Sequence, residues 1–121
     1  MKVLIVEDDL KVSRFISKQI NEWGHQVTAV TTVGEATDVA NRNMFDLVFL
    51  NLHLPDADGC ELIPRLKRAW PQARIVAMTD NNSRELALET RKHGVIYYML
   101  KPIDKKSMKD IVKYVSERLN K

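Results

Sequence analysis

Polar and charged side chains follow four of the short apolar runs in this sequence, at the point where each run ends. They are Glu7, Asp8 and Asp9 after the first run, Asn51 after the third, Thr79 and Asp80 after the fourth, and Lys101 with Pro102 after the fifth. Carboxylate oxygens are ligands that hard cations such as Mg²⁺ prefer, and a lysine beside them can pair with an anion. Phosphoryl chemistry uses both groups, because the negative charge of the reacting phosphate has to be neutralised.

Each of these residues also has a simpler explanation when it is taken alone. The acids after the first run can stabilise the amino end of a following helix. Thr79 can be a turn hydroxyl, and Lys101 can be a solvated lysine before a turn proline. Chance explains their position at four strand ends poorly, so we expect one shared site.

The apolar runs that precede these residues predict a parallel β-sheet. The runs at 3–6, 47–50, 75–78 and 95–100 are unbroken, whereas the run at 27–30 is more polar. Unbroken runs are typical of strands that are buried on both faces, as in a parallel sheet covered by helices. The run at 27–30 therefore predicts an edge strand.

Segments with helical spacing separate the predicted strands. Two apolar stripes mark the first and last helices, namely Val12, Phe15, Ile16, Ile20 and Trp23, and Met108, Ile111, Val112, Val115 and Leu119. Shorter helices are expected at about 33–42, 59–69 and 82–92. Gly24 and Gly94 are expected to close helices with a positive φ, and Ser83 or Asn82 can cap the fourth helix. The β-α order, repeated five times, predicts a doubly wound α/β sandwich with its ligand site at the carboxyl ends of the strands.

Composition limits the other possibilities. The 121 residues, 45% of them hydrophobic, predict one domain over 1–121, whose output is made by its own surface unless a further domain was trimmed away. No apolar run approaches the roughly 18 residues of a membrane span, so a cytoplasmic protein is expected. The net charge of +3 does not by itself indicate nucleic acid. Cys60 is the one cysteine, and we expect a small core residue there.

Four motifs form a specific set when they are considered together. They are VLIVEDD at 3–9, DLVFLNLHLPDADG at 46–59, AMTD at 77–80 and YYMLKP at 97–102. With them the sequence closely resembles the receiver domain of two-component response regulators along essentially all 121 residues. The resemblance implies a flavodoxin-like fold of five βα units with the strand order 2-1-3-4-5.

The resemblance also implies a phosphorylation site that holds a metal. Glu7 and Asp8 match the acidic pair that holds Mg²⁺, directly or through water, and the backbone carbonyl of His53 matches a further ligand. Position 51 matches the phospho-acceptor, an aspartate in this family, which takes a phosphoryl group from a histidine kinase or a small phosphodonor. The acceptor is also a metal ligand.

Three further residues match the switch of the family. Thr79 matches the hydroxyl that moves to grip the phosphoryl oxygens, and Lys101 matches the lysine that pairs with them. Tyr98 matches the aromatic residue whose rotamer changes with Thr79. The family often has a cis peptide bond at the position of Lys101-Pro102, and cis bonds are mainly a proline feature.

Asn51 departs from the family at the acceptor position. An amide oxygen is neutral and a poor nucleophile, so an acyl phosphate is not expected to form there. The lost ligand charge should weaken Mg²⁺ binding, and the amide can instead donate a hydrogen bond to a neighbouring carboxylate. Two accounts stay open: a natural variant that signals without aspartyl phosphorylation, or an ordinary receiver whose aspartate was replaced.

Protein partners are the main functional expectation. The family pairs the face of its fourth helix, fifth strand and last helix with a twin domain or an output protein. We therefore expect a sensor histidine kinase or another signalling protein as partner, and a homodimer through this face. Interleaved charges of both signs suit solvated helices or a charge-complementary interface, and neither a nucleic-acid nor a membrane partner is expected.

Two other functions compete with a signalling module. A Mg²⁺-dependent phosphate-ester hydrolase on the same fold would use Asp8, Asp9 and Lys101, although its best-placed nucleophile is the missing aspartate. Direct DNA binding through the basic residues would show a steep salt dependence of affinity. The sequence does not specify the kinase, the pathway or the resting arrangement of Thr79 and Tyr98.

Overall fold

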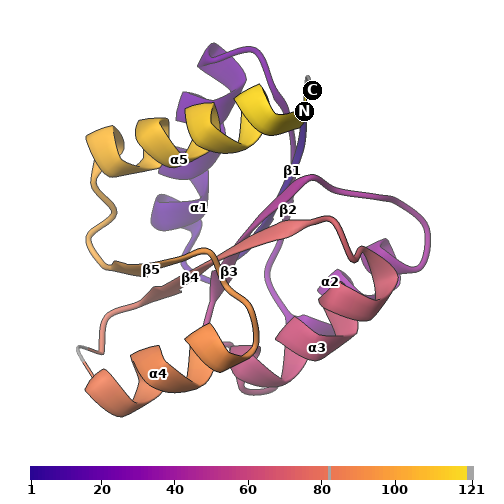
Figure 1. Cartoon of the computed structure of the whole chain (residues 1–121), viewed down its shortest axis with the longest axis vertical. Helices are drawn as coiled ribbons and strands as arrows, with labels where there is room; N and C mark the ends of the chain where they lie inside the picture. The colour runs from indigo at the N-terminus through magenta and orange to yellow at the C-terminus, as the bar shows by residue number, and fades with distance from the viewer. Residues whose placement is uncertain (82, 120–121) are drawn as a thin grey trace.

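A five-stranded parallel sheet with helices on both faces forms the protein, in a computed structural model that describes residues 1–81 and 83–119 (Figure 1). The elements alternate along the chain: β1 (Lys2–Val6), α1 (Leu10–Glu22), β2 (Gln26–Val30), α2 (Val33–Ala40), β3 (Leu47–Asn51), α3 (Gly59–Ala69), β4 (Arg74–Thr79), α4 (Arg84–Lys92), β5 (Tyr97–Leu100) and α5 (Lys105–Leu119). The strand order is β2-β1-β3-β4-β5, and every neighbouring pair is parallel. The predicted fold class and the edge position of β2 are thereby confirmed.

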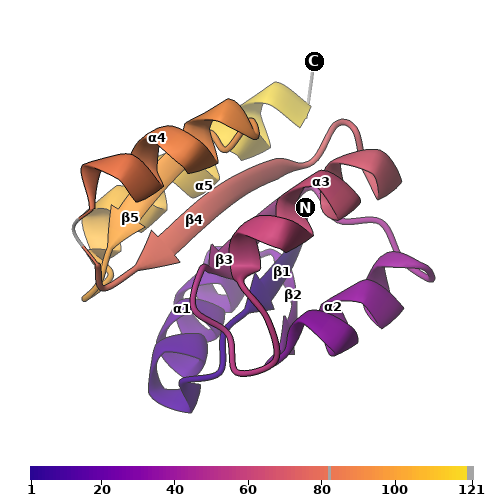
Figure 2. The same cartoon turned by 90° about the horizontal axis from the view of Figure 1, so that it is seen from below.

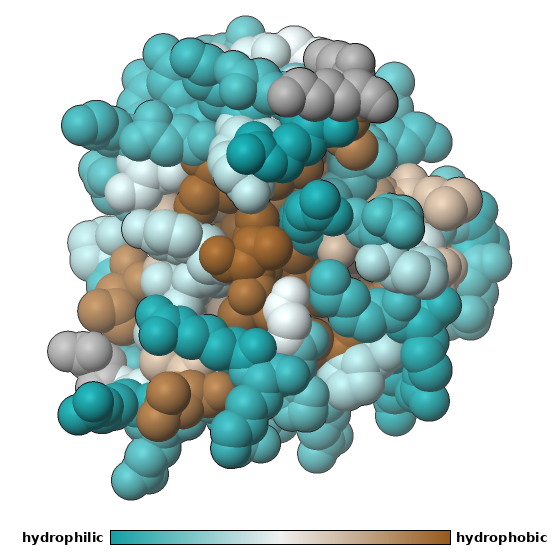
Figure 3. Space-filling view, in the orientation of Figure 1, coloured by the Kyte–Doolittle hydropathy of each residue, from teal (hydrophilic) through white to brown (hydrophobic). Residues whose placement is uncertain are grey.

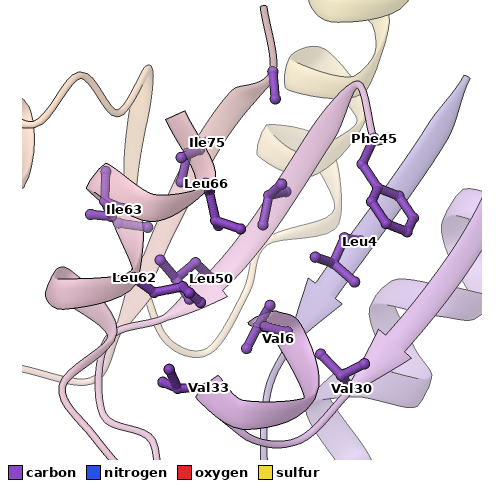
Figure 4. Close-up of a cluster of buried hydrophobic side chains, with 14 of the residues drawn as sticks. Leu4, Val6, Val30, Val33, Phe45, Leu50, Leu62, Ile63, Leu66 and Ile75 are labelled. Carbon is purple, nitrogen blue, oxygen red and sulfur yellow. The ribbon is translucent and has the colours of Figure 1, made fainter. Parts of the chain in front are cut away.

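The sheet separates two apolar layers, and its strands contribute to both. Within β1, Val3 and Ile5 pack with the helices α1 and α5, whereas Leu4 and Val6 pack with α2 and α3 on the other face. Figure 4 shows the second layer, in which side chains of α2 and α3 lie over those of the strands. Burial on both faces is the reason why the central strands read as unbroken apolar runs.

The two edge strands are less buried than the three between them. Three of the five β2 residues are exposed, and Tyr97 and Leu100 at the two ends of β5 are exposed as well. β5 begins two residues later than its predicted run, because the N–H of Val95 still bonds to the carbonyl of Thr90 in α4. Seen from below, β5 lies at one edge of the sheet between α4 and α5 (Figure 2).

Several local predictions are confirmed at the helix ends. Gly24 and Gly94 have φ values of 89° and 90° after α1 and α4, where a side chain would be strained. Ser83 caps α4 by accepting a hydrogen bond from the N–H of Leu86 at 3.1 Å, while Asn82 lies outside the described residues. Cys60 is only half-buried, so the prediction of a core cysteine holds in part. The reason is its place in the first turn of α3, at the margin of the core.

Between residues 1 and 81 and between 83 and 119, no helix is both long and apolar enough to cross a bilayer.

Candidate functional site

The carboxyl ends of four strands bring the predicted site residues to one edge of the sheet. Asn51 is the last residue of β3 and Thr79 the last of β4, while Glu7 follows β1 and Lys101 follows β5. The parallel register places Asn51 opposite Met78 and Thr79 opposite Leu100. The structure therefore brings together residues that are up to 94 positions apart in the sequence.

Glu7 is a fully buried carboxylate with a cationic partner. Its Oε1 is in direct contact with the Nζ of Lys101, which is itself mostly buried. Burial raises the pKa of Glu7, and the hydrogen bond and charge of Lys101 act against that rise. The peptide bond between Lys101 and Pro102 is cis, as the resemblance implied.

Asn51 is buried, and its amide is bonded on every side. The Nδ2 group lies 2.8 Å from Glu7 Oε2, 2.9 Å from Asp8 Oδ1 and 3.1 Å from the carbonyl oxygen of His53. The Oδ1 atom accepts a hydrogen bond from the backbone N–H of His53 at 3.2 Å. The predicted bond from the amide to a neighbouring carboxylate is therefore confirmed, and it is made to two carboxylates.

A second chain of contacts runs from His53 towards β5. Nε2 of His53 lies 3.1 Å from Oγ1 of the buried Thr79, and the same oxygen accepts a bond from the N–H of Asn81 at 3.0 Å. The hydroxyl of Tyr98 donates to the carbonyl of Asn81 at 3.0 Å. Tyr98 is thus joined to Thr79 through the backbone of Asn81. The exposed side chain of His53 joins the same chain of contacts, although the sequence predicted a role only for its backbone carbonyl.

Asp9 and Asp8 follow β1 side by side but have different roles. The Asp9 side chain caps α1 by accepting a hydrogen bond from the N–H of Lys11 at 2.9 Å. Asp8, by contrast, directs Oδ1 to the amide of Asn51. The simple capping explanation therefore holds for Asp9, and Asp8 belongs to the site.

The loop between β3 and α3 is fixed by two residues that sequence reasoning did not single out. Asp56 accepts bonds from the backbone N–H groups of Val33 and Gly34 at 2.9 and 3.0 Å, at the start of α2. Gly59 lies so close to β3 that a Cβ atom there would be 2.4 Å from the backbone oxygen of Asn51. The DADG motif contains both residues, but the partner of Asp56 is 23 positions away and leaves no local signal.

The family resemblance implied a Mg²⁺ ion among the residues around Asn51. Two carboxylates and a backbone carbonyl supply oxygens of the kind that a hard cation takes. All three direct an oxygen to the same amide nitrogen, so that a hydrogen-bond donor takes the central position. Within the described residues no group of three or more His, Cys, Asp or Glu residues could hold a metal ion. As the side chains lie, the residues do not fit a divalent cation.

Comparison with known proteins gives a consistent family assignment. The model of the response regulator receiver domain matches residues 3–113. The response regulator protein FleR of Pseudomonas aeruginosa is 30% identical over 111 residues, which cover 92% of this chain and 24% of FleR. The chain spans about a quarter of the length of this and two further curated relatives.

Solved structures agree over the whole fold. A two-component response regulator from Clostridium difficile superposes with a TM-score of 0.94 and 26% identity, covering 100% of this chain and 99% of that one. A response regulator from Burkholderia pseudomallei, solved with a phosphorylated aspartic acid, a calcium ion and citrate, has a TM-score of 0.86 and 25% identity, with 98% and 71% covered. The family model spans nearly the entire sequence, and the strand order is the one that the resemblance implied. This chain therefore belongs to the response regulator receiver domain family.

Proposed function

We propose that this receiver domain relays a change of state through protein contacts and is not phosphorylated at the end of β3. The observation that supports this most strongly is the amide of Asn51, whose nitrogen is bonded to Glu7 and Asp8 and whose oxygen is bonded to the backbone of His53. An amide in this position offers no carboxylate oxygen to attack phosphorus. Signalling then depends on contacts that the domain makes with other proteins.

The residue roles that the family implies are part of this proposal. Asn51 takes the acceptor position, and Glu7, Asp8 and the carbonyl of His53 take the positions of the other metal ligands of the family. Thr79 and Lys101 are the groups that would face a phosphoryl oxygen. Receiver domains bind a divalent cation at the phosphorylation site, and the Burkholderia relative carries calcium. For this chain we propose that the missing ligand charge weakens Mg²⁺ binding so far that the free domain holds no cation at millimolar concentrations.

Tyr98 connects the site with the proposed partner surface. Its hydroxyl is bonded to the backbone of Asn81, which is bonded in turn to Thr79, so a displacement of Thr79 reaches Tyr98 on β5 through Asn81. The neighbouring Tyr97 is 45% exposed on the outer edge of the sheet. We propose that this chain of contacts couples the site to the face formed by α4, β5 and α5.

The face of α4, β5 and α5 has the apolar character that a protein partner needs. A groove of about 350 Å³ lies between β5 and α5, lined by Ile96, Tyr97, Ser107, Asp110, Ile111 and Tyr114. Figure 3 shows apolar side chains gathered in the middle of the molecule, bordered by α5 above and α4 below. We propose that a sensor histidine kinase, another signalling protein or a second copy of the domain binds here, in the cytoplasm.

Intact mass spectrometry after incubation with acetyl phosphate and Mg²⁺ tests the proposal. The native chain is expected to gain no phosphoryl group, whereas the Asn51→Asp variant is expected to gain one. A native chain that gains a phosphoryl group would contradict the proposal. If neither protein gains one, the absence of phosphorylation is still supported, but the pocket has diverged beyond position 51 and Asn51 is not its only cause.

The hydrolase alternative makes an opposite prediction for the same proteins. Asp9, one of its three proposed residues, is engaged as the cap of α1, and Lys101 is paired with Glu7. We therefore expect no turnover of p-nitrophenyl phosphate with Mg²⁺. Turnover that is abolished by Asp8→Ala would favour the hydrolase over the signalling module.

A further inference from the structure

We propose that the side-chain amide of Asn51 takes the place of the divalent cation, so that this domain holds its acidic site together without a metal. This deepens the proposed function, because both rest on Asn51, but the two are tested by different measurements. The proposal concerns the free protein and makes no use of phosphorylation.

The geometry places one nitrogen where several oxygens converge. Glu7 Oε2, Asp8 Oδ1 and the carbonyl oxygen of His53 lie 2.8, 2.9 and 3.1 Å from Nδ2 of Asn51. These are ordinary lengths for N–H···O bonds, whereas oxygens bind Mg²⁺ at about 2.0–2.1 Å. The oxygens therefore surround a hydrogen-bond donor, and they would have to close in by almost 1 Å to coordinate Mg²⁺.

A half-turn of the amide would not create a metal site without cost. It would direct Oδ1 inward as a ligand, but it would also turn the Nδ2 group towards the backbone N–H of His53. That N–H now donates to Oδ1 at 3.2 Å, so the rotation would replace a hydrogen bond with two opposed donors. An aspartate has no such conflict, because both of its oxygens are acceptors.

The charges of the site also support a site without a metal. Glu7 and Asp8 are two carboxylates that share one amide, and like charges this close repel each other unless donors or cations lie between them. Asn51 supplies N–H donors to both, and Lys101 supplies a full positive charge to Glu7. The pair is therefore compensated from within the chain. Replacing the amide with a carboxylate would add a third negative charge and create the need for a cation.

Nuclear magnetic resonance of the native protein is the first test. The side-chain NH₂ of Asn51 is expected to give two resolved proton signals that exchange slowly with water, since the residue is 4% exposed. Mg²⁺ is raised from none, in the presence of EDTA, to about 10 mM. Both signals are expected to stay in place, because a cation that does not bind the folded protein does not change the surroundings of the amide. A Mg²⁺-dependent shift or loss of these signals near 1 mM would overturn the proposal.

Thermal unfolding compares how Mg²⁺ affects the native chain and the Asn51→Asp variant. The melting temperature of the native chain is expected to change by less than about 1 °C between EDTA and 10 mM Mg²⁺, while that of Asn51→Asp rises by several degrees. Asn43→Asp, an exposed position in the loop before β3, adds the same charge away from the site and is expected to behave like the native chain. An equal rise for the native chain and Asn51→Asp would refute the proposal, and the result from native resonance signals stands even if Asn51→Asp does not fold.

Discussion

Glu7 and Trp70 lie at opposite ends of the sheet, and each is buried by a different kind of interaction. At the carboxyl ends of the strands, Glu7 is a fully buried charge that contacts Lys101 and Asn51. At the amino ends, the ring of Trp70 packs edge-on against Phe45, with centroids 5.2 Å apart. Its Nε1 donates to the carbonyl of Asn43 at 2.7 Å.

The amino end also joins its strands through Asp46, without burying a charge. The Asp46 backbone bonds to the carbonyl of Lys2 and the N–H of Arg74, and its half-buried side chain accepts from the N–H of Lys2 at 2.8 Å. Apolar burial and backbone bonds stabilise a fold, whereas a buried charge costs free energy unless it is well paired. The comparison indicates that the amino end contributes more to stability than the carboxyl end, where a charge is buried.

Truncation of Trp70 should have the largest effect, because it removes the main contact of the amino end. Trp70→Ala is expected to lower the free energy of unfolding by about 3–5 kcal/mol, measured by urea denaturation. Trp70→Phe keeps a ring against Phe45 and loses only the indole donor, so a loss of about 1 kcal/mol is expected. A smaller loss for Trp70→Ala than for a single change at the carboxyl end would reverse the comparison.

Removal of Lys101 tests the buried charge directly. Lys101→Met leaves Glu7 buried with no cation, and we expect a loss of about 2–3 kcal/mol, below the usual range for a buried pair because Lys101 is 19% exposed. Lys109→Met, an exposed lysine on α5, should change stability by less than about 0.5 kcal/mol. Equal stabilities of the two variants would show that Glu7 does not depend on Lys101.

The loss in Lys101→Met should also depend on pH. Burial raises the pKa of Glu7, and in Lys101→Met the ammonium group that opposes this rise is gone. A carboxyl group whose pKa is higher in the folded state binds its proton more tightly there, so acidification favours folding. The difference between native and variant stability is therefore expected to shrink as the pH falls from about 7 to about 5.

Much of this arrangement could be predicted from the sequence, because a strand that is buried on both faces consists of consecutive apolar residues. Val3 to Val6 alternate between two apolar layers, so an unbroken apolar run was the correct signal for a strand with two covered faces. Parallel strands in βα order bring their carboxyl ends to one edge, which predicted the meeting of Glu7, Asn51 and Lys101.

Side-chain direction could not be predicted in the same way. The capacity of Asn51 to donate to a carboxylate follows from its chemistry, but its bonds to both Glu7 and Asp8 depend on the final geometry. The contact of the His53 ring with Thr79 joins the loop after β3 to the end of β4, 26 positions along the chain. Residue type limits what such groups can bond to, and only the fold determines which partner is within reach.

The smallest effect is expected at Asp56, a charge at the carboxyl end that is exposed rather than buried. Its bonds to the N–H groups of Val33 and Gly34 lower the pKa of the carboxyl group. A lowered pKa in the folded state gives stability that is present above the unfolded value, near pH 4, and is lost as the pH falls through the folded value. Asp56→Asn should therefore melt at a lower temperature than the native chain at pH 7, with a difference that shrinks as the pH falls below about 4. Asp110→Asn, an exposed charge on α5, is the matched control, and a difference that stays constant with pH would show that the charge of Asp56 does not fix the loop between β3 and α3.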